Sequence, residues 1–114
     1  MPLTTFRDRR SGELQSALRV LTGARDQQNA DRLRCINALT ALVRTHDLGI
    51  GARRARTGTQ IATIASWRHR EEKLGAATAR TEATRLAKRI TTLESDLAEN
   101  REQLTRIEET IAPE

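Results

Sequence analysis

Residues 79–111, "ARTEATRLAKRITTLESDLAENREQLTRIEETI", decide the fold of this 114-residue chain. Seam residues, nearly all apolar, recur here at intervals that alternate between four and three, which is the spacing of a coiled coil. The seam positions are Ala79, Ala83, Leu86, Ile90, Leu93, Leu97, Asn100, Leu104, Ile107 and Ile111. We therefore predict one long helix over residues 72–111 that pairs with another helix along this seam.

Asn100 is the one polar member of this seam. A single Asn in a coiled-coil seam commonly fixes the register or the number of helices, at some cost in stability. The alternative is an Asn that stays half-exposed beside a fraying helix end. Pro113 is expected to close the helix, which leaves residues 112–114 as a short tail.

The front half of the chain carries a second seam with the same spacing, apolar at both ends and polar in the middle. Its positions are Leu14, Leu18, Leu21, Arg25, Gln28, Arg32, Cys35, Leu39 and Leu42. With Ser11 as its N-cap, this pattern predicts a long helix over residues 12–45 behind a disordered arm over residues 1–11. Gly49 and Gly51 in "HDLGIG" supply the freedom to turn after it.

Residues 46–71 read as a basic loop that contains a short helix. Thr57 and Gln60 have the spacing of a capping box, and the apolar patch of Ile61, Ile64 and Trp67 follows. The predicted fold is therefore all-α: an antiparallel hairpin of two long helices with a short helical cap at its tip. Because each seam is narrow, we expect the chain to associate as a homodimer or higher oligomer.

Composition argues against several classes of protein. Cys35 is the single cysteine, and it falls on an apolar seam, where an inert buried residue is expected. His46 and His69 lie far apart and outside any metal-binding or catalytic motif, and no glycine-rich phosphate loop is present. No apolar run suits a membrane span or a signal peptide. We expect a cytoplasmic protein without a cofactor, a metal or a small-molecule substrate, and not an enzyme by itself.

Charge is distributed unevenly along the chain. Residues 1–70 hold thirteen Arg and Lys against five Asp and Glu, a net of +8, whereas residues 71–114 hold seven against ten, a net of −3. The candidate site is the arginine cluster between the two long helices, which comprises Arg53, Arg54, Arg56, Arg68 and Arg70. One interpretation is a contact for the phosphates of DNA or structured RNA. The other is a solvated face, with the arginine bias following from a GC-rich genome.

Trp67 stands beside these arginines and is the only tryptophan of the chain. An aromatic ring among cations suits stacking on an unpaired base. The ring also lies on the same apolar face as Ile64, which favours the role of a hydrophobic anchor for the short helix.

Three phrases of the sequence together resemble a known family. They are "ALRVLTGARDQQNADRLRCINALTALVRTHDLG" (residues 17–49), "TQIATIASWRHRE" (59–71) and "ARTEATRLAKRITTLESDLAENREQLTRI" (79–107). The chain resembles the central region of the insertion-sequence one-ten transposases, the Piv-like, DEDD-type recombinases that depend on a guide RNA. The resemblance extends from about Gly12 to Pro113.

In that family the corresponding segment is a helical coiled-coil insert between a RuvC-like domain with four acidic metal ligands and a domain with a catalytic serine. The resemblance therefore implies helix pairing, oligomer contacts and contact with nucleic acid. Neither catalytic domain has a counterpart in this sequence. We expect a truncated transposase fragment that is inactive alone in DNA transposition. The alternatives are a free-standing helical adaptor for a protein partner and a remnant of a decayed mobile element.

Overall fold

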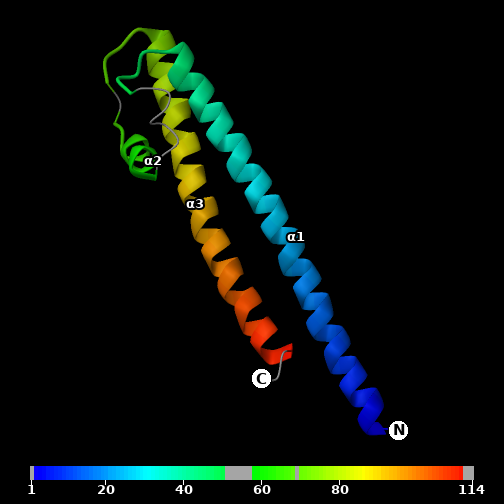
Figure 1. Cartoon of the computed structure of the whole chain (residues 1–114). Coiled ribbons are helices and arrows are strands. Elements are labelled where there is room, and N and C mark those ends of the chain that lie inside the picture. The colour runs from blue at the N-terminus through cyan, green and yellow to red at the C-terminus, as the bar shows by residue number, and fades with distance from the viewer. Residues whose placement is uncertain (1, 51–57, 69, 112–114) are drawn as a thin grey trace. The chain divides into compact units, whose positions relative to one another are not determined.

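The chain folds into three helices in the computed structural model, which describes residues 2–50, 58–68 and 70–111. They are α1 (Pro2–Thr45), α2 (Gly58–Ala65) and α3 (Leu74–Ile111) (Figure 1). No strand occurs within these described ranges. The long helices α1 and α3 pack against each other as a hairpin, with the short α2 between them in the sequence. The all-α hairpin predicted from the two seams is therefore confirmed.

Helix α1 begins much earlier than the sequence pattern suggested. It starts at Pro2, so the predicted start at residue 12 is wrong, and so is the disordered arm for residues 2–11. Ser11 lies inside the helix and does not cap it. Pro2 suits the first helical position because its fixed φ angle is helical and its missing N–H needs no partner there. Gly12 is tolerated in the interior at a cost of about 1 kcal/mol relative to alanine.

Helix α1 ends where the glycine-containing turn was predicted. The His46 N–H donates to the Leu42 carbonyl at 3.0 Å, which completes the last turn. Gly49 then adopts a φ of +85°, a conformation that a residue with a Cβ atom rarely accepts. Asp47 Oδ1 accepts a hydrogen bond from the Gly49 N–H at 3.3 Å. Gly51 and the Thr57 cap position lie outside the described residues.

The described chain divides into two compact units. Unit 1 comprises residues 1–29 and 96–114, and unit 2 comprises residues 30–95. Unit 2 holds a continuous hydrophobic core that receives side chains from all three helices. Its buried members are Leu39, Val43, Leu48, Ile61, Ile64, Ala79, Ala83, Ala87 and Ile90.

The core of unit 2 explains the position of the short helix. Ile61 and Ile64 of α2 are 2% and 0% exposed, so α2 contributes its apolar face fully to this core. On α3 the residues that join them include three alanines four positions apart, at 79, 83 and 87. Small side chains with this helical spacing lie on one face and allow a neighbouring element to approach closely.

Unit 2 also shows how the polar middle of the first seam is accommodated. Arg32 donates from Nε and Nη2 to Glu94 Oε2 at 3.1 and 2.8 Å, which joins α1 to α3. Arg80 of α3 approaches the Leu48 carbonyl at 3.4 Å. Residue 32 thus pairs with residue 94, whereas residue 48, later in the chain, pairs with residue 80, earlier on α3. The two long helices of this unit are therefore antiparallel. Because the Arg32 and Glu94 side chains are 36% and 42% exposed, this ion pair contributes little to stability.

Unit 1 has much less apolar burial. Among its described side chains, Asn100 and Leu104 are buried, whereas its other apolar seam residues on α1 and α3 are half-buried and the seam position Arg25 is exposed. The half-buried seam residues of this unit are Leu14, Leu18, Leu21, Gln28, Leu97, Ile107 and Ile111. In unit 2, Leu39, Ile90 and Leu93 of the predicted seams are buried, and Leu42 and Leu86 are half-buried.

Asn100 makes a directional contact between the two helices of unit 1. It is 4% exposed, and its Nδ2 donates to the backbone carbonyl of Leu21 at 2.9 Å. This bond forms only when Leu21 lies opposite Asn100, so it favours one register. Asn100 Oδ1 is buried without a donor among the described atoms, as is Gln28 Oε1. Such an acceptor costs about 1–3 kcal/mol, so the register is gained at the expense of stability.

We predict that Asn100→Leu raises the free energy of unfolding by about 1–2 kcal/mol, because it removes the unpaired Oδ1 and adds apolar surface. Chemical denaturation followed by circular dichroism measures this change. Thr105→Leu, at an exposed position of the same helix, is the control and should change stability by less than about 0.5 kcal/mol. A destabilised Asn100→Leu chain would show that the bond to Leu21 outweighs the unpaired oxygen.

Candidate functional site

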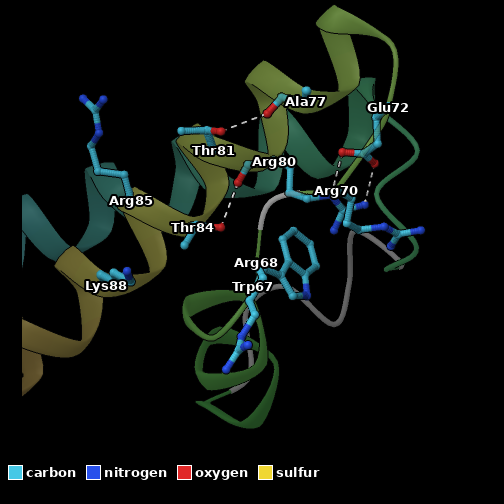
Figure 2. A pocket seen from close by; sticks show the side chains of 10 residues that line it. All are labelled: Trp67, Arg68, Arg70, Glu72, Ala77, Arg80, Thr81, Thr84, Arg85 and Lys88. Carbon is cyan, nitrogen blue, oxygen red and sulfur yellow. Dashed lines mark hydrogen bonds and ion pairs between the residues drawn. The ribbon is translucent and has the colours of Figure 1, made fainter.

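The turn region of unit 2 is organised around one buried guanidinium, that of Arg80 on α3. Arg80 Nε and Nη2 donate to the two carboxylate oxygens of Glu72, each at 2.9 Å. Nη2 also approaches the Leu48 carbonyl at 3.4 Å, and the guanidinium lies 4.5 Å from the centre of the Trp67 ring. Figure 2 shows this group between the Trp67 indole and Glu72. One side chain thus joins the segments that follow α1, follow α2 and precede α3.

The Arg80–Glu72 pair is an internal contact of the fold. The two side chains are 7% and 13% exposed, so both charges are largely removed from water. Bidentate geometry and stacking on an aromatic ring are contacts that arginine makes and lysine does not. Because its charge is already compensated by Glu72, Arg80 positions the neighbouring groups and is not available to an external anion.

We predict that Arg80→Ala destabilises the fold by about 3–5 kcal/mol, since it removes the two charge-assisted hydrogen bonds that Arg80 donates to the largely buried Glu72 carboxylate. Arg80→Lys should recover a small part of this loss because it keeps the charge but not the fork geometry. The measurement is urea denaturation of both variants beside Arg85→Gln, whose exposed side chain pairs with Glu82 and should matter by less than about 1 kcal/mol. Equal stability of the three variants would contradict the positioning role of Arg80.

A hollow of about 340 Å³ opens beside this group, and several exposed cations line it. We call it the basic hollow. Its lining residues are Trp67, Arg68, Arg70, Glu72, Ala77, Arg80, Thr81, Thr84, Arg85 and Lys88 (Figure 2).

Four cations of the basic hollow are exposed: Arg68 and Arg70 from the segment after α2, and Arg85 and Lys88 from α3. Arg85 has an ion pair with Glu82 at 3.1 Å, but its side chain is 73% exposed, so this contact is easily exchanged. In Figure 2 the Arg85 guanidinium is directed away from the indole, and Arg85 therefore contributes to the rim of the hollow.

The two threonines that line the basic hollow donate their hydroxyl hydrogens to backbone carbonyls of α3. Thr81 donates to the Ala77 carbonyl at 3.0 Å, and Thr84 donates to the Arg80 carbonyl at 2.8 Å. The hydroxyl oxygens are then left as acceptors. An anion in the hollow would consequently be held by the four exposed cations.

Two of the five arginines predicted from the sequence, Arg68 and Arg70, line the basic hollow. Arg53, Arg54 and Arg56 lie outside the described residues. The prediction missed the contribution of α3, which supplies the other half of the cations. Arg85 and Lys88 are three positions apart and therefore share a helix face, a signal that the charge count along the chain does not contain.

Trp67 both packs on the core and borders the basic hollow. It is half-buried against the core cluster of unit 2. The same ring also lines a neighbouring hollow together with Leu48, Gly49, Ile50 and Arg80. The predicted anchor role agrees with its packing, and part of the indole nevertheless faces open space beside the arginines.

The remaining groups singled out by the sequence have no part in this hollow. Cys35 is half-buried against the core cluster, and His46 is half-buried just after α1. Across the described residues, no three His, Cys, Asp or Glu side chains converge where they could hold a metal ion. In the same part of the chain, each helix is too short or too polar to cross a lipid bilayer.

Comparisons with protein-family models, with curated proteins and with solved structures found no match to this chain.

Proposed function

We propose that this chain is a helical module that contacts nucleic acid by holding phosphates in the basic hollow. The observation that carries the proposal is that four exposed cations from two segments, residues 68–70 and 85–88, line or border one cavity. Glu72, the acid that lines the hollow, is compensated by Arg80. Phosphate contacts need cations that can approach a strand, and they do not need a sequence-specific geometry.

Like charges do not gather on a protein surface without cost. Arg68, Arg70 and Lys88 repel one another in the free protein, and none of them has an acidic partner at ion-pair distance among the described residues. A polyanion relieves this repulsion and releases its own condensed counterions on binding, which is a favourable and strongly salt-dependent contribution. A solvated face is the simpler alternative, and it predicts no such binding.

The resemblance to the central region of the insertion-sequence one-ten transposases supports the same interpretation. In this proposal the chain is a cytoplasmic fragment of a DNA-transposition recombinase, inactive alone, that retains helix pairing and nucleic-acid contact. DNA and structured RNA are both candidate partners because a phosphate-directed site accepts either. A protein adaptor and a remnant without a role are the competing proposals, and neither requires the four exposed cations.

We predict that replacing Arg68, Arg70, Arg85 and Lys88 together by glutamine weakens nucleic-acid binding at least tenfold. The slope of log K against log salt should also become less negative by about 0.7–0.9 for each phosphate that the variant no longer neutralises. The assay is fluorescence anisotropy of a labelled oligonucleotide at several salt concentrations.

The matched control removes four other exposed arginines, Arg19, Arg34, Arg101 and Arg106, none of which lines the basic hollow. Both variants have the same net charge. If both lose affinity equally, binding depends on total charge and the hollow has no special role. If the wild-type chain fails to bind at all, the nucleic-acid proposal is wrong.

We propose also that a second copy of the chain covers the apolar face of unit 1. Val20 is 68% exposed there, beside an open hollow of about 450 Å³ that it lines together with Ala17, Leu21 and Ile107. The charges favour a second copy as the occupant. Residues 2–29 hold five Arg against three acids, a net of +2, and residues 96–111 hold two Arg against five acids, a net of −3. Each helix segment therefore attracts the opposite segment of another copy.

We predict that Val20→Asp shifts the chain toward monomer by at least tenfold in the dissociation constant, because it places a charge on the covered face. Helicity should be retained, since Val20 contributes little to burial within the unit. Sedimentation equilibrium measures the shift, with Gln15→Asp, another exposed position of α1, as the control. A wild-type chain that stays monomeric at high micromolar concentration would contradict association.

A further inference from the structure

The basic hollow has an aromatic wall as well as cations, and phosphate binding alone does not require one. Resting on the proposed function, we infer that the hollow receives an unpaired nucleotide, with its base against the Trp67 indole and its phosphates on the surrounding cations. The partner class is thereby narrowed to single-stranded or looped segments of nucleic acid. Trp67 and Ala77 supply apolar side chains to the lining.

The Trp67 ring is held in place before any ligand arrives. The Arg80 guanidinium lies 4.5 Å from the ring centre and is itself fixed by two hydrogen bonds to Glu72. The ring also packs against the core cluster. A base would therefore meet an aromatic surface that is already ordered, and binding would cost little side-chain entropy there.

The rest of the indole remains accessible from the side of the basic hollow. Trp67 lines this hollow and the adjacent one and is half-buried, so part of it remains exposed among the described residues. A purely structural tryptophan would be satisfied by its contacts with Arg80 and the core. The additional open surface, bordered by Arg68 and Arg70, is what a planar apolar ligand with an attached anion can use.

A nucleotide combines the two chemical properties that this lining matches. Its base offers a flat π face to an aromatic side chain, and its phosphates are anionic. In a duplex the base faces are stacked on their neighbours and cannot reach Trp67, whereas an unpaired base can turn toward it. Arg68, Arg70 and Lys88 line the same hollow as Trp67, so cations from two elements lie beside the site of the base.

The experiment uses the full chain and three probes of about equal length and charge per strand: an oligothymidylate, an abasic oligomer with the same phosphates, and a duplex. Trp67 is the only tryptophan and the chain has no tyrosine, so its fluorescence reports on this site alone. The oligothymidylate should bind about tenfold more tightly than the abasic oligomer, consistent with stacking of one base, and should quench the emission. The abasic oligomer and the duplex should bind without quenching.

Trp67→Leu separates the base contact from the phosphate contact. It should lower the affinity for oligothymidylate to that of the abasic oligomer and leave the abasic affinity unchanged, which also serves as a check that the variant is folded. Trp67→Phe should retain part of the difference because it keeps an aromatic ring.

The outcomes distinguish the two proposals. Equal affinities for oligothymidylate and abasic oligomer, without quenching, would overturn the nucleotide inference and leave phosphate binding intact. Equal loss of affinity for both probes in Trp67→Leu would assign the ring a structural role and likewise overturn it. Absence of binding to all three probes would reject the proposed function itself.

Discussion

The ion pair between Arg80 and Glu72 is the contact on which the turn region depends. The chain must reverse direction after α1, place α2 on the core and enter α3, and the intervening segments have few apolar residues to hold them. A guanidinium offers five donors in a plane and an apolar face, so it can bind a carboxylate, a carbonyl and an aromatic ring at once. Arg80 uses these properties on Glu72, Leu48 and Trp67. The contact connects segments that the hydrophobic core alone would leave loosely attached.

The basic hollow owes its shape to this same contact. Because Arg80 takes up the charge of Glu72, no other acid among the described lining residues offsets the exposed cations of the hollow. The fold thus separates two uses of arginine. Arg80 is buried and serves the structure, whereas Arg68 and Arg70 are exposed and remain available to a partner. Replacing Arg80 would therefore change the stability of the fold, whereas replacing Arg68 or Arg70 would change the binding of a partner.

The sequence predicted the helices far better than the site, for a physical reason. The four-three spacing of Leu86, Ile90 and Leu93 is a local pattern, and a helix converts it directly into a buried face. The sequence does not locate the start of α1, because Ser11 suits an N-cap but is also compatible with a helix interior. The contribution of Arg80, Arg85 and Lys88 to the site cannot be predicted from the sequence, because their proximity to Trp67 depends on the turn that brings α2 onto α3. No periodicity in the sequence encodes that approach.

The unequal burial in the two units has a consequence for local motion. The buried core of unit 2 lies in residues 39–48, 61–64 and 79–90. Among the described residues of unit 1, only Asn100 and Leu104 are buried. A backbone segment opens to solvent more readily where fewer buried contacts restrain it. Amide hydrogens in residues 9–29 should therefore exchange with solvent through small local openings, while those of the core in unit 2 should require global unfolding. The difference in exchange rates between the two ends of α1 would thus measure how much less stable unit 1 is than unit 2. A partner that covers unit 1 would be expected to reduce this difference.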